Sequence, residues 1–240
     1  MNEGGRYAMK TKNTWAWEQF DELPSTNEYV KTHAAEKDLI VTAKRQSGGK
    51  GTKGRSFSSN DGGVYLTKLT HYTDFKAKDA FLVMASAAVA VCKTLVSYGL
   101  EPKIKWPNDV FVADKKICGI LIENVFSGAK LTRSIVGIGL NVWNVLPEEL
   151  NSIATSMKKQ GVVADVEEVT CRLIAALDEE ISMDEYLSFL GYMGKEAIVV
   201  FGDERVPATL LSVDNEGGLW VKTSNGERRF LAAEVSLRFA

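Results

Sequence analysis

The run Lys-Trp-Pro-Asn-Asp at residues 105–109 constrains the fold more than any other feature of this 240-residue chain. Pro107 cannot donate a backbone hydrogen bond to a sheet and restricts the residue before it, so a β-strand must end there. A short hairpin then returns into a second apolar strand. The break gathers an amide, a carboxylate and an ammonium at neighbouring strand ends: Asn108, Asp109 and Lys116. This combination suits an anion or a metal-bound phosphate, and the competing interpretation is an ordinary hairpin with a polar turn.

A glycine-rich, basic segment at residues 46–57 points to the same chemistry. Four glycines within residues 48–54 allow positive φ angles and a close approach of the backbone to a ligand. Residues 39–60 contain no acid and carry these cations: Lys44, Arg45, Lys50, Lys53 and Arg55. The segment is neither a Walker loop nor a Rossmann fingerprint, because its glycine and lysine spacing fits neither pattern. The sequence therefore predicts an anion-binding loop, with a solvated flexible linker as the alternative.

Composition limits the classes of function. A net charge of −2 and a pI near 5.8 argue against general nucleic-acid binding. The two histidines, His33 and His71, lie far from any serine or cysteine motif, which disfavours a catalytic triad and a histidine-rich metal site. Three widely spaced cysteines indicate buried thiols in a reducing compartment. The apolar stretch at residues 81–91 is too short to span a bilayer, and the polar N-terminus lacks a secretory leader, so we expect a cytoplasmic protein.

The pattern of apolar residues predicts an α+β chain with two domains. Helices are expected at residues 27–35, 78–98 and 165–189, with an irregular helical region at 147–150. Strands are expected at 15–23, 39–43, 63–70, 103–106, 110–112, 117–124, 133–141, 197–201, 205–213, 219–223 and 228–231. We expect residues 1–14 to be a disordered extension, 15–190 the larger domain and 191–240 a small β-barrel.

In their order along the chain, these motifs resemble those of the biotin protein ligases, also called biotin–[acetyl-CoA-carboxylase] ligases, in the short form without a DNA-binding domain. The matching segments are Ser-Thr-Asn at 25–27, the glycine-rich biotinyl-adenylate loop at 46–57, Lys-Trp-Pro-Asn-Asp at 105–109, Lys-Ile-Cys-Gly-Ile at 116–120 and Gly-x-Gly-x-Asn at 137–141. The similarity extends from about residue 15 to the C-terminus, where residues 217–239 resemble the end of a small barrel.

The resemblance implies a fold and a reaction. The implied fold is a class II synthetase-like domain, a mixed sheet packed against helices, followed by a small SH3-like β-barrel. Residues 15–190 would bind biotin and ATP, with Mg²⁺ on the phosphates, and form biotinyl-5′-AMP. The biotin would then pass to a lysine of a biotin-accepting carrier domain through a new C–N amide bond. No DNA or membrane partner is expected, and the choice between monomer and homodimer is left open.

Three residues are expected to act in catalysis. Lys116 would neutralise the biotin carboxylate and the charge that develops on the α-phosphate. Asp109 would hold Mg²⁺ and orient or deprotonate the acceptor amine, and Lys50 would bring the positive charge of the loop to the adenylate. The alternatives are a surface lysine on a hairpin for Lys116 and a turn cap for Asp109.

Binding residues come from the same motifs. The resemblance assigns contacts with biotin, ATP or the adenylate to Ser25, Thr26, Asn27, Gln46, Gly48, Gly49, Lys50, Gly51, Thr52, Lys53, Trp106, Asn108, Lys116, Gly119 and Asn141. Ser25 also suits a helix N-cap. Asn141 could instead simply end its strand, and Trp106 could instead belong to the core.

One departure from the family pattern concerns the loop. Arginine is usual in the family at both positions that Lys50 and Thr52 occupy here. Lysine keeps the charge but loses the bidentate geometry, and threonine loses the charge. Phe57 stands where tryptophan is usual. We therefore expect weaker retention of biotinyl-AMP than is usual in the family, unless Lys53 or Arg55 compensates.

Two other functions remain open at this stage. A lipoate–protein ligase or octanoyltransferase has the same broad architecture but different glycine and lysine signatures. A catalytically inactive sensor of biotin or nucleotide is the non-enzymatic alternative. Its regulatory form would need a DNA-binding helix-turn-helix before the Ser-Thr-Asn motif, and residues 1–24 are too few for one.

Overall fold

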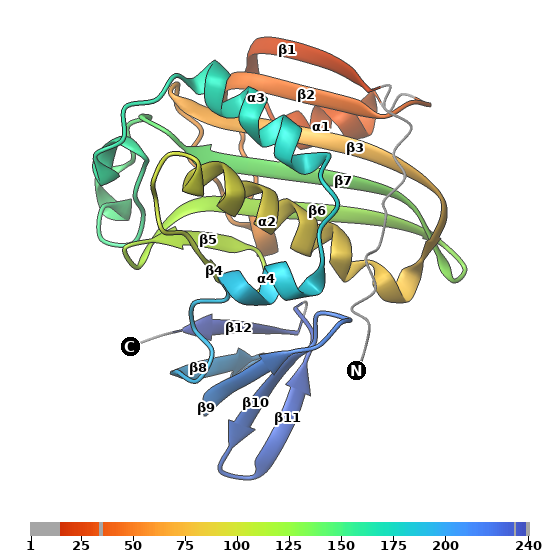
Figure 1. Cartoon of the computed structure of the whole chain (residues 1–240), viewed down its shortest axis with the longest axis vertical. Helices are drawn as coiled ribbons and strands as arrows, with labels where there is room; N and C mark the ends of the chain where they lie inside the picture. Colours follow the sequence, from red (N-terminus) through yellow and green to blue (C-terminus); the bar gives the residue numbers. More distant parts are fainter. Residues whose placement is uncertain (1–14, 34–35, 233, 239–240) are drawn as a thin grey trace.

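A seven-stranded sheet forms the centre of the computed structural model, which describes residues 15–33, 36–232 and 234–238 (Figure 1). Its order is β1-β2-β3-β7-β6-β5-β4, with β1 and β2 parallel and the other described pairs antiparallel. The strands are β1 Ala16–Leu23, β2 Leu39–Gln46, β3 Gly63–Lys76, β4 Lys103–Lys105, β5 Asp109–Val112, β6 Lys115–Ser127 and β7 Lys130–Asn141. The predicted mixed sheet is confirmed, and the predicted extension at residues 1–14 lies outside the described residues.

Helices cover one face of this sheet and enclose the main core: α2 (Phe81–Val96), α3 (Val166–Leu177) and α4 (Met183–Phe189) (Figure 1). Short 3₁₀ turns lie at Thr52–Gly54, Ala77–Asp79, Glu148–Leu150 and Lys158–Gln160. The continuous stretch Ala77–Val96 is apolar enough and long enough to cross a membrane, which corrects the expectation drawn from the shorter run 81–91. However, 67% of its most apolar window is buried within the protein, as expected for a central core helix.

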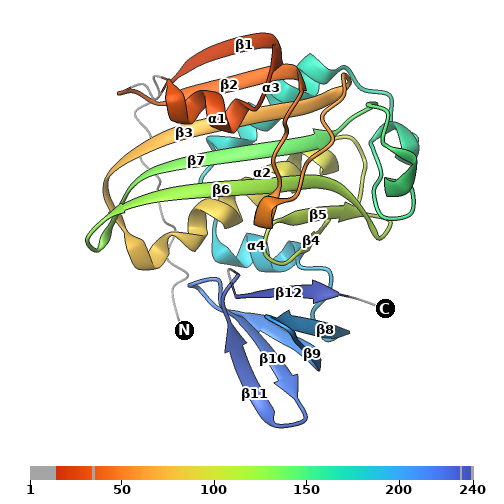
Figure 2. The ribbon, with the colours of Figure 1, turned by 180° about the vertical axis from the view of Figure 1, so that it is seen from behind.

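Helix α1 (Thr26–Thr32) packs on the opposite face of the sheet (Figure 2). Ser25 begins it, because its extended backbone lets the side-chain oxygen accept from the N–H of Glu28. Val30 is fully buried in a small second core cluster with Val41 and Leu69. The glycine-rich loop crosses β7 and β6 on this same face, where no described helix covers them (Figure 2).

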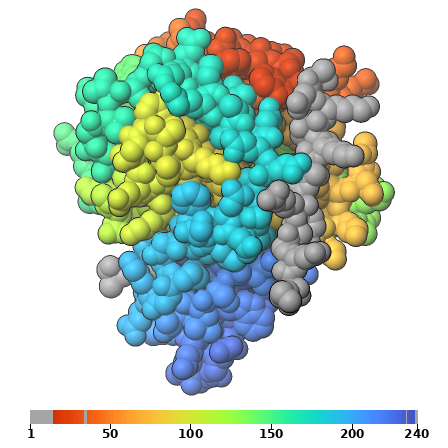
Figure 3. All heavy atoms as spheres, in the orientation of Figure 1, coloured from red at the N-terminus to blue at the C-terminus, as the bar shows by residue number. Residues whose placement is uncertain are grey.

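The C-terminal strands form a separate antiparallel sheet. They are β8 Glu196–Phe201, β9 Glu204–Val213, β10 Leu219–Thr223, β11 Gly226–Phe230 and β12 Val235–Arg238, in the order β11-β10-β9-β8-β12. The described strands do not close into a barrel, because β11 and β12 remain at opposite edges. This sheet shares the main core with the larger one, and Trp106 Nε1 donates to the carbonyl of Gly217 at 3.0 Å. Figure 3 shows its atoms (blue) directly adjoining those of the helices.

The single helix predicted over residues 165–189 is wrong, because the structure divides it into α3 and α4. Lys68 of β3 donates to Asp178 at 2.5 Å, and this long-range ion pair fixes the end of α3. Ser182 then starts α4 through a capping box with Glu185. Apolar periodicity does not show this interruption, because the partner of Asp178 is more than one hundred residues away and the capping box is a polar signal.

The turn before β10 depends on one carboxylate. Asp214 accepts hydrogen bonds from Arg229 Nε, Trp220 Nε1 and the N–H of Gly218. The hydrogen bond from Arg229 is the main reason that the pKa of Asp214 falls to about 2, from an ordinary 3.8. This stabilisation is therefore complete above pH 3.8 and is lost as the pH falls toward 2.

We expect Asp214→Asn to lower the free energy of unfolding by about 1–3 kcal/mol at pH 7, because several donors lose a charged acceptor. Chemical denaturation measures the change. The difference from wild type should shrink as the pH falls from 3.8 to 2. Asp203→Asn, in the exposed turn between β8 and β9, is the matched control. An equal loss in both variants would contradict the assigned role of Asp214.

Candidate active site

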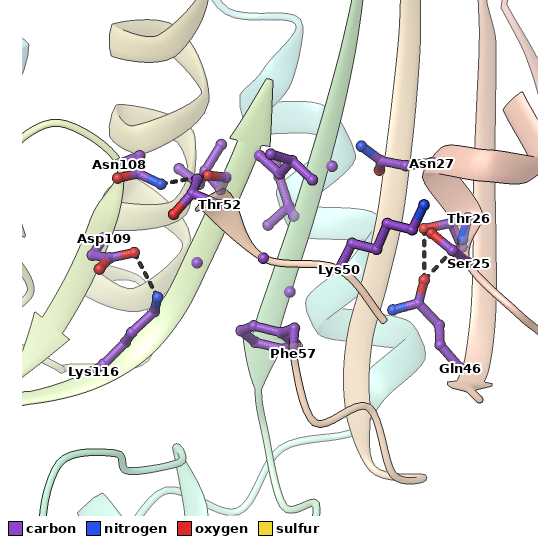
Figure 4. A pocket seen from close by; sticks show the side chains of 17 residues that line it. Ser25, Thr26, Asn27, Gln46, Lys50, Thr52, Phe57, Asn108, Asp109 and Lys116 are labelled. Atoms are coloured by element: carbon purple, nitrogen blue, oxygen red, sulfur yellow. Dashed lines mark hydrogen bonds and ion pairs between the residues drawn. The ribbon is translucent and has the colours of Figure 1, made fainter. Parts of the chain in front are cut away.

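A polar pocket opens on the α1 face of the large sheet, between α1, the glycine-rich loop and strands β5, β6 and β7 (Figure 4). About 480 Å³ of empty space lies within it, a volume that includes its open mouth. Its lining residues are Ser25, Thr26, Asn27, Gln46, Lys50, Gly51, Thr52, Phe57, Asn108, Asp109, Lys116, Gly119, Ile120, Leu121, Gly137, Ile138 and Gly139. Every motif identified in the sequence therefore contributes to one cavity.

Hydrogen bonds fix the amide of Gln46 at one end of the pocket. The backbone N–H and the hydroxyl of Thr26 both donate to Gln46 Oε1, at 2.8 and 3.1 Å. Gln46 Nε2 donates to the hydroxyl of Ser59 at 2.9 Å. Strand β2 continues beyond the predicted residue 43 to Gln46, which carries this side chain to the pocket. The result is a rigid set of neutral donors and acceptors.

Asn27 lies beside this end on a floor of small residues. The hydroxyl of Thr67 donates to Asn27 Oδ1 at 2.6 Å, and Asn27 Nδ2 lies 3.4 Å from a carboxylate oxygen of Glu123. A Cβ added at Gly137 would collide with the Asn27 amide. The glycine therefore leaves the space that this buried side chain occupies.

The glycine-rich loop is pinned at its base and reaches over the strands. The N–H of Gly48 donates to the carbonyl of Pro24, and the N–H of Phe57 donates to the carbonyl of Gly49. The Phe57 ring lies on Gly119 of β6 and Gly139 of β7, where a Cβ at either position would meet it. These paired glycines thus form the seat of the aromatic ring.

The strand break places the charged groups at the other end of the pocket. Lys116 Nζ lies 2.6 Å from Asp109 Oδ1. Asn108 Nδ2 donates to the carbonyl of Ile120 at 2.7 Å, which joins the break to β6. Figure 4 shows this pair on the side of the pocket opposite Ser25, Thr26 and Gln46. The cavity therefore has a neutral polar end and a charged end.

The carboxylates around the pocket could hold a magnesium ion only together with ligands from a substrate. Among the described residues, no group of three or more His, Cys, Asp or Glu side chains could hold a metal ion. Asp109 is the carboxylate that lines the pocket. Mg²⁺ commonly binds through one or two carboxylates together with substrate phosphates, so Asp109 fits an ion that arrives with ATP.

Lys50 of the loop makes an ion pair outside the pocket lining. Its ammonium lies 2.9 Å from Glu28 of α1, and Lys31 lies at the same distance from the same oxygen. Hydrogen bonds from Lys31 and then Lys50 lower the pKa of Glu28. Lys31 also reaches Glu123 at 2.6 Å.

Comparison with known protein families gives a match over residues 18–141, the part of the chain that builds this pocket, to the biotin/lipoate A/B protein ligase family. The chain belongs to this family.

Proteins of this family resemble the chain over most of its length. The bifunctional ligase/repressor BirA of Bacillus subtilis is 28% identical over 90% of this chain and 72% of its own length. The biotin–[acetyl-CoA-carboxylase] ligase of Mycobacterium tuberculosis is 28% identical over 69% of this chain and 65% of its own. The structure of the Aquifex aeolicus biotin protein ligase with biotin and ATP matches with a TM-score of 0.76 at 26% identity, covering 95% of this chain and all of that one.

The structure of this family member brings most of the predicted site residues together. Those in the pocket lining are Ser25, Thr26, Asn27, Gln46, Lys50, Gly51, Thr52, Asn108, Asp109, Lys116 and Gly119. Gly48 and Gly49 lie at the base of the loop, outside the lining. The side chain of Lys53 lies outside the described residues, so its assignment stays a prediction.

Two residues that were predicted to contact a ligand, Trp106 and Asn141, are buried and make hydrogen bonds within the protein. Trp106 is 4% exposed and packs toward the C-terminal sheet, so the structure favours the core alternative for it. The buried amide of Asn141 donates to the carbonyl of Thr155 and accepts from Asn144. Asn141 borders a neighbouring cavity, and its contact with a nucleotide stays a prediction.

The glycine and apolar floor of the pocket was not among the predicted ligand contacts, although most of its residues lie in the matched motifs: Phe57, Ile120, Leu121, Gly137, Ile138 and Gly139. A usable signal was present in the alternating glycines of β7, because a glycine inside a strand often marks a close approach by a ligand or another chain segment. Lys105, the first residue of the Lys-Trp-Pro-Asn-Asp run, was also not among the predicted contacts.

Lys105 lines a neighbouring cavity that shares Thr52, Asp109 and Lys116 with the pocket. Burial lowers the pKa of Lys105, Asp109 opposes that shift, and Lys116 adds to it. Arg55 lines the same cavity. The charged end of the pocket therefore opens into a second space with several cations on its walls.

Proposed function

We propose that this chain is a biotin protein ligase that joins biotin to ATP as biotinyl-5′-AMP and passes biotin to a lysine of a carrier domain. The observation that carries the proposal is the two-ended pocket. Its neutral end suits the ureido ring of biotin, which needs fixed donors and acceptors. The charged end, with Lys116 and Asp109, suits a carboxylate that meets a phosphate.

In the first step, an oxygen of the biotin carboxylate attacks the α-phosphorus of ATP, and pyrophosphate leaves. The carboxylate is already ionised at neutral pH, so no general base is needed. Lys116 stabilises negative charge between the two reactants. The β- and γ-phosphates extend into the neighbouring cavity beside Lys105 and Arg55. Mg²⁺, held by Asp109 and the phosphates, would screen their charge.

In the second step, the neutral amine of the carrier lysine attacks the acyl carbon of biotinyl-AMP. The C–N bond forms, AMP leaves, and the amine proton passes to Asp109. Asp109 lies at the mouth shared with the neighbouring cavity, where an incoming side chain can reach it. Lys116 orients the Asp109 carboxylate through their ion pair at 2.6 Å.

The chain organisation follows from this function. We propose residues 15–190 as the catalytic biotin- and ATP-binding domain of class II synthetase type. Residues 191–240 form the small C-terminal domain, whose five described strands support an SH3-like interpretation without a closed barrel. The acceptor is a carrier domain of the acetyl-CoA carboxylase type, in the cytoplasm, and a homodimer stays an open alternative.

Exchange of ³²P-pyrophosphate into ATP tests the proposal. Exchange that depends on biotin supports it. Exchange that depends instead on lipoate or octanoate would assign the chain to the other branch of the family. Biotin binding without any exchange would indicate a sensor.

We expect the glycine-rich loop to close over biotinyl-AMP, because its glycines make the open state entropically favourable and its cations favour the bound phosphate. Trypsin cleavage after Lys50, Lys53 or Arg55 should slow sharply when biotin and ATP are added together. Biotin alone is the control. Equal cleavage with and without both ligands would count against closure.

We expect Thr52→Arg to slow the release of biotinyl-AMP by about 5- to 30-fold, because it adds a charge-assisted contact where this chain has a hydroxyl. Biotin affinity should change little. The measurement is the dissociation rate of labelled adenylate, with Thr52→Gln as the size-matched neutral control. A rate identical to wild type would mean that another cation of the loop already fills this role.

A further inference from the structure

Lys50 is directed away from the charged end of the pocket. Its side chain lines the pocket, but its ammonium lies 2.9 Å from Glu28, which is not part of the lining. Figure 4 shows Lys50 extended toward Ser25 and Thr26, while Lys116 lies on the opposite side. An anion in the pocket therefore has to draw this ammonium away from Glu28.

Lys31 provides a second partner for the same carboxylate. Its ammonium lies 2.9 Å from the oxygen of Glu28 that Lys50 contacts. When Lys50 leaves, Glu28 keeps Lys31, so no isolated carboxylate remains at this half-buried position. Glu123 holds Lys31 in place from β6 at 2.6 Å. The exchange of partners therefore costs little.

We propose that Glu28 is a positioning residue that competes with the anionic ligand for Lys50, and that Lys31 sets the strength of this competition. The inference rests on the proposed function, in which the anion is the phosphate of biotinyl-AMP. Because residue 50 is a lysine, its ammonium pairs with either Glu28 or the ligand anion. A guanidinium could contact two acceptors at once, whereas a compact ammonium on one stem favours a single strong partner.

The competition predicts effects of opposite sign at two neighbouring residues. Glu28→Gln removes the competing charge, so release of biotinyl-AMP should slow by about two- to five-fold, the range that exposed ion pairs give. Lys31→Gln removes one of the two lysines that pair with Glu28, so Glu28 should hold Lys50 more strongly. Release of biotinyl-AMP should then become faster by a similar factor.

The experiment follows dissociation of radiolabelled biotinyl-AMP, formed in the protein from biotin and ATP, after a chase with excess unlabelled biotin and ATP. Glu22→Gln is the matched control, because it removes the same charge from an exposed ion pair with Arg45 at the sheet edge. Its release rate should equal that of wild type. Thermal unfolding confirms that each variant is folded.

A double-mutant cycle with Lys50 shows whether Glu28 acts by positioning Lys50 or by a general effect on the structure. In a Lys50→Met background, Glu28→Gln should leave the release rate unchanged, because the competed ammonium is absent. If Glu28→Gln does not fold, Lys31→Gln tested with and without Lys50→Met examines the same pairing.

The outcomes are distinct. Slower release in Glu28→Gln and faster release in Lys31→Gln, both absent without Lys50, support the inference. Unchanged or faster release in Glu28→Gln overturns it while leaving the ligase function intact. A wild-type protein that forms no adenylate overturns both proposals.

Discussion

Replacement of Lys116 by alanine is expected to lower biotin-dependent ATP–pyrophosphate exchange by about 10²–10³-fold, the loss typical when one preorganised charge-stabilising group is removed. Lys116 lines the pocket and lies 2.6 Å from Asp109, at the end where the carboxylate and α-phosphate would meet. The expected loss falls on the chemical step, so the exchange rate at saturating biotin and ATP should drop. Initial rates of exchange, measured over a range of biotin and ATP concentrations, give this saturating rate.

Lys115→Ala is the matched control for this result. Lys115 is the adjacent residue of β6, lies outside the pocket lining, and donates to the carbonyl of Asn151 at 2.8 Å. The two variants lose the same charge one residue apart. The backbone bonds of Lys116 to Ile153 and Thr155 do not involve its side chain, so the fold should persist. Equal activity in both variants would remove Lys116 from the reaction.

Gly137→Ala is expected to weaken biotin binding by about 5- to 150-fold. The added methyl group would occupy the place of the Asn27 amide, which is 5% exposed and accepts from Thr67. Displacement of that amide leaves buried polar groups unpaired, at a cost of about 1–3 kcal/mol, and misaligns the neutral end of the pocket. Calorimetric titration with biotin measures the effect.

A double-mutant cycle tests the physical cause. The collision of Gly137→Ala involves only the amide atoms of Asn27, so Asn27→Ala removes it. In the Asn27→Ala background, the second substitution should therefore add little further loss. Additive losses would show that the glycine matters for another reason, such as packing of β7.

Local sequence patterns determined much of the architecture. Alternation and apolar periodicity predicted the strands of the large sheet and the helix α2, because these patterns follow directly from the geometry of each element. The proline of the Lys-Trp-Pro-Asn-Asp run predicted the break between β4 and β5, and the structure confirms it. The order of motifs also pointed to the family, which the match over residues 18–141 establishes.

Long-range contacts decided what those patterns could not. At the break between α3 and α4, Lys68 contacts Asp178 at the end of α3 from far along the chain, and the local Ser182–Glu185 capping box starts α4. The open arrangement of the C-terminal strands depends on which edges pair, and strand propensity does not specify that. Trp106 is apolar in any context, and only the position of Gly217 assigns it to the core.

For the site, local motifs were enough to predict which residue types line the pocket. Amide, carboxylate, ammonium and glycine groups stand in recognisable motifs because each motif is local. The local hairpin already predicted that Lys116 lies near Asp109. The tertiary structure decided that Lys50 pairs with Glu28 and that the Asn27 amide lies over Gly137. Each of these last two pairs joins segments that only the folded sheet and its loop bring within a few ångströms. The interaction energy of charges and hydrogen bonds depends on that distance, which no local pattern encodes.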